Sequence, residues 1–278
     1  MKKINRRSFL AAAGLTAAAL ALTACGGSAS STASSTASSA ASSEAASTSA
    51  AAELTTVEAG KLTMATNAAF PPYEMTTDAG EFEGIDIDTA KAIAEKLGLE
   101  LQIDDMDFDA ALLSVQQGKA DIVMAGVTVT DERKAVMDFS DSYATGIQSI
   151  IVPEGSDITS PDDLAGKKIG TQRGTTGYIY CSDDFGDDAV VAYDNGLTAV
   201  QALNNGQVDA VVIDNAPAKE FVAANPGLVI LDTSYAEEDY AIGMAKGSAL
   251  EDAINKALEE LKADGTLQSI VDKYITAE

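Results

Sequence analysis

Apolar runs and helical patterns alternate along the first half of the chain after residue 60. The runs near residues 62, 101 and 122 fit buried strands, because each is rich in apolar positions and bounded by turn residues. The segments between them have an apolar position every three or four residues, as one face of a helix requires. The pattern predicts these elements in order: strand 62–66, helix 86–97, strand 101–103, helix 110–117 and strand 122–127.

The second half repeats this alternation. Ser160 followed by Pro161 predicts the start of a helix, because proline suits the first helical position. Further on we expect strands at 168–170, 190–192, 210–213 and 229–231, and helices at 250–262 and 267–274. Alternating strands and helices indicate an α/β architecture with largely parallel sheets.

An internal repeat suggests two similar lobes. Residues 114–126 align without gaps on residues 202–214, each with a helix end, a glycine, an aspartate three residues later and a buried strand. Such units also recur by chance in α/β proteins. If the repeat is real, Gly126 and Asp214 occupy the same strand-end position, and both face the groove beyond the carboxyl ends of the strands.

Arg133 breaks a local rule. Thr130 is a good N-cap, and Asp131 and Glu132 suit the first turn of the helix that follows. An arginine in that turn is opposed by the helix dipole. A guanidinium at the exit of a strand can grip a carboxylate through two parallel hydrogen bonds. The alternative, an ion pair with Asp131 or another surface acid, stays open.

The N-terminus has the features of an exported, anchored protein. A basic start precedes an apolar stretch too short to span a bilayer comfortably, which predicts a signal peptide over residues 1–25. Residues 22–26 resemble a bacterial lipobox, in which Cys25 is lipidated after cleavage. Residues 5–10 resemble a twin-arginine export signal, although an ordinary basic start explains them equally well. The Ser/Ala-rich segment 26–56 is expected to be a disordered tether.

Composition excludes several functions. The formal net charge of −25 argues against nucleic acid as a partner. The chain has no histidine, and if Cys25 is lipidated the remaining thiol is Cys181. Thiolate and imidazole metal sites, a Ser-His-Asp triad and an intramolecular disulfide are therefore excluded. The acidic clusters 104–107 and 183–188 lack calcium-loop spacing, so we expect no metal and no cofactor.

Several linked motifs carry a family resemblance. The chain is similar, from about residue 62 to 274, to the family 3 extracellular solute-binding proteins, the polar amino acid receptors of ABC importers. One departure is Thr89, where the family usually has a larger apolar residue. The matching motifs are Gly84-Ile85-Asp86-Ile87-Asp88, residues 90–94, residues 125–133 and Asp138-Phe139-Ser140-Asp141-Ser142-Tyr143.

The resemblance implies a fold. It is the type II periplasmic-binding-protein-like fold, an α/β architecture with two lobes joined by two hinge strands. Residues 57–147 and 245–278 would form lobe 1, and residues 148–244 would form lobe 2.

The resemblance also implies roles for charged residues. Arg133 would hold the α-carboxylate of an amino acid, assisted by Thr128 and the backbone at Thr176. Asp214 would pair with the α-ammonium, with the Gly126 carbonyl as second acceptor. This is physically consistent, since each buried charge needs a partner. Taken alone, Asp214 could instead be the N-cap of a helix over 215–221.

Four further residues would contact the ligand side chain. Phe70 resembles an aromatic wall and Phe108 a second one, although both could simply belong to the core. Asn67 and Gln172 fall where the family places specificity contacts. Relatives that bind cationic amino acids tend to have an acid at the Asn67 position, so its absence favours a neutral, polar ligand.

The expected function is therefore a lipid-anchored, monomeric receptor outside the cytoplasm that clamps an amino acid and delivers it to an ABC transporter permease. It would be no enzyme and would need no cofactor. The alternative is an enzyme resembling cyclohexadienyl or arogenate dehydratases of the same fold, with Glu74 as a nominal acid. A binding module for adhesion or sensing is a third possibility.

Overall fold

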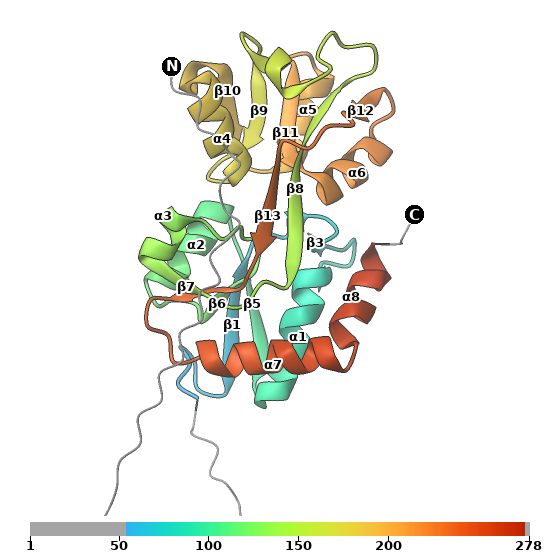
Figure 1. Cartoon of the computed structure of the whole chain (residues 1–278). Helices are drawn as coiled ribbons and strands as arrows, with labels where there is room; N and C mark the ends of the chain where they lie inside the picture. The colour runs from blue at the N-terminus through green and yellow to red at the C-terminus, as the bar shows by residue number, and fades with distance from the viewer. Residues whose placement is uncertain (1–53, 276–278) are drawn as a thin grey trace, which may run out of the picture. The chain divides into compact units, whose positions relative to one another are not determined.

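The computed structural model describes residues 54–275, which form an α/β structure with two lobes (Figure 1). The expected signal peptide, Cys25 and the tether up to residue 53 lie outside the described residues. Leu54 packs against the core, and the backbone N–H of Val57 donates to Asp121. The globular part therefore begins earlier than residue 57.

Lobe 1 is built on a sheet with the strand order β5-β1-β6-β14-β7. Its strands are β1 (Lys61–Thr66), β5 (Glu100–Asp105), β6 (Ile122–Val123), β7 (Met137–Phe139) and β14 (Gly243–Ala245). A small sheet next to it contains β2 (Ala69–Phe70), β3 (Glu74–Thr76) and β4 (Phe82–Glu83). The helices are α1 (Ile85–Leu97), α2 (Phe108–Gln116), α3 (Asp131–Val136), α7 (Glu251–Ala263) and α8 (Thr266–Tyr274).

Lobe 2 has a sheet of order β10-β9-β11-β8-β12, with β13 also paired to β8. Its strands are β8 (Ala144–Pro153), β9 (Ile169–Gln172), β10 (Val190–Tyr193), β11 (Ala210–Asp214), β12 (Leu228–Ile230) and β13 (Ala236–Tyr240). Its helices are α4 (Thr176–Phe185), α5 (Gly196–Asn204) and α6 (Asn215–Ala224), with the 3₁₀ turns η1 (Pro161–Leu164) and η2 (Asp187–Ala189).

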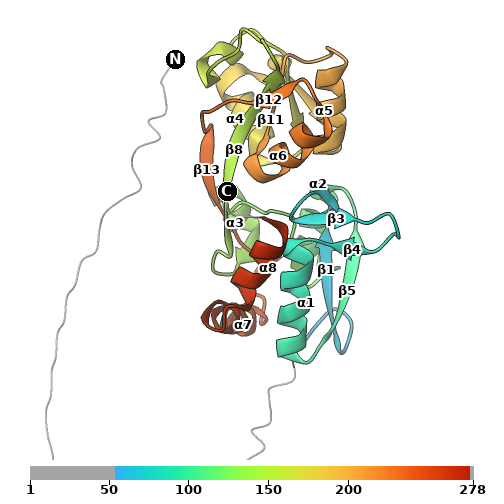
Figure 2. The same cartoon turned by 90° about the vertical axis from the view of Figure 1, so that its right-hand side faces the viewer.

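The chain passes between the lobes on β8 and β13, which pair antiparallel with Ala236 opposite Gln148 and Tyr240 opposite Ala144 (Figures 1 and 2). β14 already pairs with β6 in lobe 1 from Gly243 onward, two residues before the boundary expected at 245. The two-lobed fold with two connecting strands, expected from the family resemblance, is confirmed.

The sequence repeat corresponds to a structural repeat. Gly118 and Gly206 follow α2 and α5 with nearly identical φ values of 67° and 66°. The Asp121 carboxylate accepts the backbone N–H of Thr63, and the Asp209 carboxylate accepts that of Lys168. In each lobe the aspartate therefore fixes the start of the adjacent parallel strand, which explains why the repeat contains it.

Two elements differ from the sequence-based expectation. The strand expected over 122–127 is assigned only at Ile122–Val123, because Gly126 turns the chain with φ 55° and gives its N–H to the Asp86 carboxylate. The helix expected after Ser160 is the single 3₁₀ turn Pro161–Leu164.

We predict that Gly146 on β8 tolerates no side chain. A Cβ at this position would lie 2.4 Å from the ring of Tyr240, which is fully buried on β13 and has no room to move. Gly146→Ala should lower the free energy of unfolding by about 1–3 kcal/mol through overpacking. Denaturant unfolding measures this. Thr145→Ala, at an exposed position on the same strand, is the control, and equal stability of both variants would contradict the prediction.

Candidate functional site

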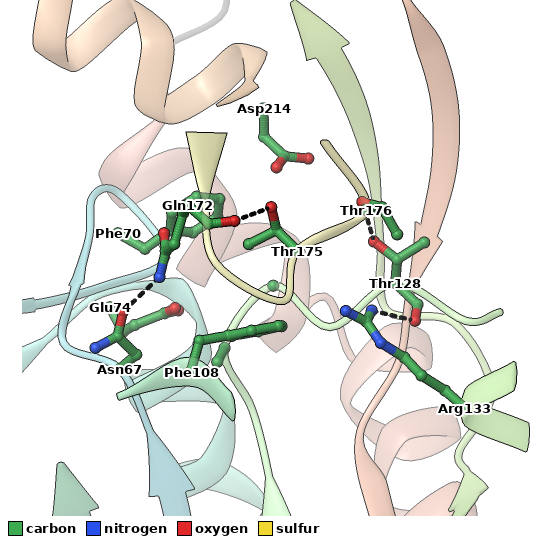
Figure 3. Close-up of a pocket in the computed structure, with 12 residues that line it drawn as sticks. Asn67, Phe70, Glu74, Phe108, Thr128, Arg133, Gln172, Thr175, Thr176 and Asp214 are labelled. Atoms are coloured by element: carbon green, nitrogen blue, oxygen red, sulfur yellow. Dashed lines mark hydrogen bonds between the residues drawn. The ribbon is translucent and has the colours of Figure 1, made fainter. Parts of the chain in front are cut away.

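One pocket lies where the carboxyl ends of the strands in the two lobes face each other (Figure 3). All nine residues that the sequence analysis proposed as ligand contacts line it. Three further residues also line it: Glu74, Ala125 and Thr175. The lining residues are Asn67, Phe70, Glu74, Phe108, Ala125, Gly126, Thr128, Arg133, Gln172, Thr175, Thr176 and Asp214.

Arg133 is buried at one end of the pocket, with 8% of its surface exposed. It lies in the short helix α3, whose N-cap Thr130 accepts the Arg133 backbone N–H as predicted. Its guanidinium donates to the carbonyls of Thr128 at 2.8 Å and Gly174 at 3.1 Å. No carboxylate in residues 54–275 is within ion-pair distance of it, so the surface ion-pair interpretation is wrong. Desolvation lowers the pKa of Arg133, because burial disfavours the charged guanidinium. An anion in the pocket would offset this cost of burying the charge.

Helix α4 directs its N-terminus at the same end. Thr175 is its N-cap, and its side chain accepts the Tyr178 backbone N–H. The first backbone N–H groups of a helix have no partner within the helix and favour anions. The buried position of Thr176 at this terminus is therefore suited to a carboxylate that Arg133 also contacts.

Asp214 lies in the other part of the pocket, at the end of β11 (Figure 3). It occupies the N-cap position of α6, but its side chain makes no cap hydrogen bond. The carboxylate accepts the phenol O–H of Tyr240 instead and is 7% exposed. The capping interpretation is therefore wrong, and the strand-end position derived from the repeat explains the residue.

Asn67 and Gln172 connect the lobes. Asn67 follows β1 and Gln172 ends β9, and the Gln172 amide donates to the Asn67 carbonyl oxygen at 2.9 Å. The Asn67 amide donates to the Met106 carbonyl. Both specificity candidates thus line the pocket while hydrogen-bonded within the protein.

The two aromatic candidates line the pocket and also belong to the core. Phe70 stacks on Tyr73 with centroids 5.9 Å apart, and Phe108 lies under the Arg133 guanidinium at 5.3 Å. A Cβ at Gly126 would approach Phe70 to 2.9 Å, so glycine is required there for space as well as for its positive φ.

Glu74 was not proposed as a ligand contact, yet its environment is unusual. It is 1% exposed, and its oxygens accept no N–H or O–H donor among the described residues, although the Glu74 and Asp86 carboxyl groups lie within hydrogen-bond reach of each other. Desolvation, followed by the charge of Asp86, raises the pKa of Glu74 well above its usual range. Desolvation also raises the pKa of Asp86 to about 6. The signal available in the sequence was an acid two residues after a pair of prolines, in a segment rich in apolar residues.

Neither a metal site nor a membrane span emerges from the described part of the chain. Residues 54–275 contain no group of three or more potential metal ligands. None of their helices is both long and apolar enough to cross a membrane.

The fold and the pocket define a two-lobed solute-binding protein. The chain matches the model of the bacterial extracellular solute-binding proteins, family 3, over residues 62–277, and it belongs to this family.

Relatives with stated ligands support the same class. The "Probable histidine-binding protein" of Neisseria gonorrhoeae is 33% identical, over 99% of this chain and 98% of its own length. A solved ancestral arginine-binding protein bound to glutamine is 44% identical with a TM-score of 0.75, covering 78% of this chain and 99% of its own. An ancestral arginine-binding protein bound to arginine is 45% identical with a TM-score of 0.74, covering 78% and 98%.

We predict that Asp214 makes stability depend on pH. Burial, and then the charge of Glu238, raises the pKa of Asp214 to about 7. The folded protein therefore holds this proton more tightly than the unfolded chain, so the contribution to stability is full below about pH 4 and is lost as the pH rises towards 7. Asp214→Asn should remove this loss. The free energy of unfolding of Asp214→Asn, measured relative to that of the wild type, should therefore be about 1–3 kcal/mol higher at pH 8 than at pH 5.

Denaturant unfolding of the ligand-free protein at the two pH values measures the effect. Asp183→Asn, at an exposed position in α4, is the control and should follow the wild type. A constant difference between Asp214→Asn and the wild type across this range would contradict the prediction.

Proposed function

We propose that this protein is an extracytoplasmic receptor that clamps a free amino acid between its lobes for an ABC importer. The observation that supports this is a pair of buried opposite charges facing one pocket from different lobes. Arg133 in lobe 1 has no carboxylate partner in residues 54–275, and Asp214 in lobe 2 is held by a neutral phenol. An α-amino acid carries the carboxylate and the ammonium that these two groups need.

The lobes contact one another directly at the pocket, which supports binding by closure. Arg133 donates to the Gly174 carbonyl, and Gln172 donates to Asn67. A ligand that bridges Arg133 and Asp214 would add its own contacts to this arrangement. Its binding would then shift the equilibrium between open and closed lobes towards the closed state.

The N-terminal sequence supports a proposal for the cellular setting. We propose that residues 1–25 are removed, that Cys25 carries the lipid anchor, and that the following Ser/Ala-rich segment is the tether. Two acyl chains on one lipid anchor suffice for stable attachment. The monomeric receptor would deliver its amino acid to the permease of the importer, and it would catalyse no reaction.

The ligand side chain is best matched by a basic group. Asn67 alone favoured a neutral, polar ligand, but its amide is already hydrogen-bonded to Met106 and Gln172. Glu74, by contrast, lines the pocket with a buried carboxyl group that receives no N–H or O–H donor among the described residues and has the Asp86 carboxyl as its near neighbour. A guanidinium or ammonium would supply that partner. The stated ligands of the relatives include both arginine and glutamine.

We predict that the protein without its first 53 residues binds an amino acid with at least micromolar affinity, and that Arg133→Ala weakens this binding by about 100-fold or more. The variant loses the guanidinium that would hold the carboxylate in a buried site. Calorimetry with the common L-amino acids measures both effects. The control is Arg173→Ala, since this neighbouring arginine is exposed and should leave the affinity within about two-fold.

Failure of every amino acid to bind would refute the proposed function. In that case turnover of arogenate or prephenate should be assayed, because Glu74 is a buried acid with a raised pKa, as the dehydratase alternative requires.

We predict that Glu74→Gln separates basic from neutral ligands. The amide cannot compensate a guanidinium, so affinity for L-arginine should fall by about 10-fold to 100-fold, or about 1.4–2.7 kcal/mol. Affinity for L-glutamine should change by less than about three-fold. Glu81→Gln, in the exposed turn before β4, is the matched control. Equal losses for both amino acids would contradict a basic subsite at Glu74.

A further inference from the structure

Strand β13 carries a buried acid directly behind the pocket. Its burial alternates, with Glu238 and Tyr240 inward and Glu237 and Asp239 exposed. The Glu238 side chain is 6% exposed, comparable to Asp214, although it does not itself line the pocket. A carboxylate is expensive to bury, so its hydrogen bonds indicate why it is there.

Those hydrogen bonds come from two residues that do line the pocket. Glu238 Oε2 accepts from Thr128 Oγ1 at 3.0 Å and from Thr176 Oγ1 at 2.9 Å. It also accepts from Gln148 Nε2 on β8 at 3.0 Å. Thr128 belongs to lobe 1 and Thr176 to lobe 2, so this one oxygen joins both lobes and a connecting strand.

The count of hydroxyl hydrogens fixes the direction of these bonds. A threonine hydroxyl has one hydrogen to donate and two lone pairs that can accept. The two hydroxyl oxygens also lie 3.4 Å from each other (Figure 3), a longer contact than either makes with Glu238. Since a carboxylate only accepts, we assign the hydrogens of Thr128 and Thr176 to the two shorter bonds to Glu238. The Thr176 hydroxyl also accepts from Gln148 at 3.4 Å. The Thr128 hydroxyl therefore presents only lone pairs to the pocket.

A hydroxyl that can only accept is suited to a cation and unsuited to a carboxylate. The Thr128 side chain would thus serve the ammonium of an amino acid, while its backbone carbonyl orients Arg133. The Thr128 hydroxyl would therefore act on the ammonium of the ligand, and the Thr128 carbonyl, through Arg133, on its carboxylate. The sequence analysis had placed Thr128 only beside the carboxylate. The anion would be left to Arg133 and the N-terminus of α4.

We propose that Glu238 is a positioning residue of the ammonium subsite, which holds the Thr128 hydroxyl as an acceptor and adds negative charge behind it. The inference rests on the proposed amino acid binding. It assigns Glu238 a role through Thr128 rather than by contact with the ligand. The effect should therefore be the same for any α-amino acid, whatever its side chain.

The test is calorimetry with L-arginine and L-glutamine as probes. Glu238→Gln removes the charge and brings an amide that can donate to the hydroxyls, so Thr128 no longer faces the pocket only as an acceptor. Binding of both probes should weaken by about ten-fold or more, and by a similar factor. Glu237→Gln, the adjacent exposed position on β13, is the matched control and should stay within about two-fold.

A double-mutant cycle separates positioning from a general structural effect. In a Thr128→Val background, Glu238→Gln should cost less than about three-fold, because the hydroxyl through which it acts is gone. Thr128→Ser keeps the hydroxyl and should restore the full effect. If Glu238→Gln does not fold, Glu238→Asp keeps the charge but withdraws it from the hydroxyls, and it should weaken binding in the same way.

The outcomes distinguish this inference from the proposed function. If the wild type binds and Glu238→Gln binds equally well or more tightly, the role of Glu238 is overturned while the proposed function stands. Tighter binding by Glu238→Gln would indicate that the Glu238 charge repels the ligand carboxylate. Additive effects of the two substitutions would also overturn it. If the wild type binds no amino acid in the panel, the proposed function and this inference both fall.

Discussion

The buried charge of Arg133 is the constraint on which the site depends. Its guanidinium is removed from water; within residues 54–275 it donates to two carbonyl oxygens, Thr128 in lobe 1 and Gly174 in lobe 2, and lies over the Phe108 ring. Carbonyl dipoles solvate a cation but do not neutralise it. The lobes therefore meet at an arginine that has no carboxylate within ion-pair distance among the described residues, although the charge of Glu238 acts on it from further away. A carboxylate placed there would complete the interface as well as the site.

The repeated lobe explains why the complementary charge lies opposite. In both copies an aspartate ties the start of a parallel strand, which fixes where the carboxyl ends of the strands lie. Gly126 and Asp214 occupy the equivalent strand-end position in the two copies of the repeat, and both line the pocket. One architectural unit thus supplies a backbone turn in one lobe and a carboxylate in the other.

Much of this was predictable, because it rests on local rules. The Thr130 cap, the helix-ending Gly118 and the burial of the strands follow from patterns within a few residues. What the pattern missed depends on distant partners. β13 has the polar sequence Ala-Glu-Glu-Asp-Tyr, and it is a strand because β8 supplies its ladder and buried hydroxyls satisfy Glu238. Asp214 resembles a helix cap locally, and only Tyr240 on β13 shows otherwise.

The balance of buried charge argues for the class of ligand. Arg133 is the one buried cation among residues 54–275, whereas Glu74, Asp86, Asp214 and Glu238 are buried acids in or around the pocket. Raised pKa values for Glu74, Asp86 and Asp214 mean that part of this excess is held as neutral acid. A neutral amino acid adds no net charge to this balance. A basic amino acid adds one positive charge, which would compensate an acid that otherwise needs a proton, and this supports the proposal of an arginine-like rather than a glutamine-like ligand.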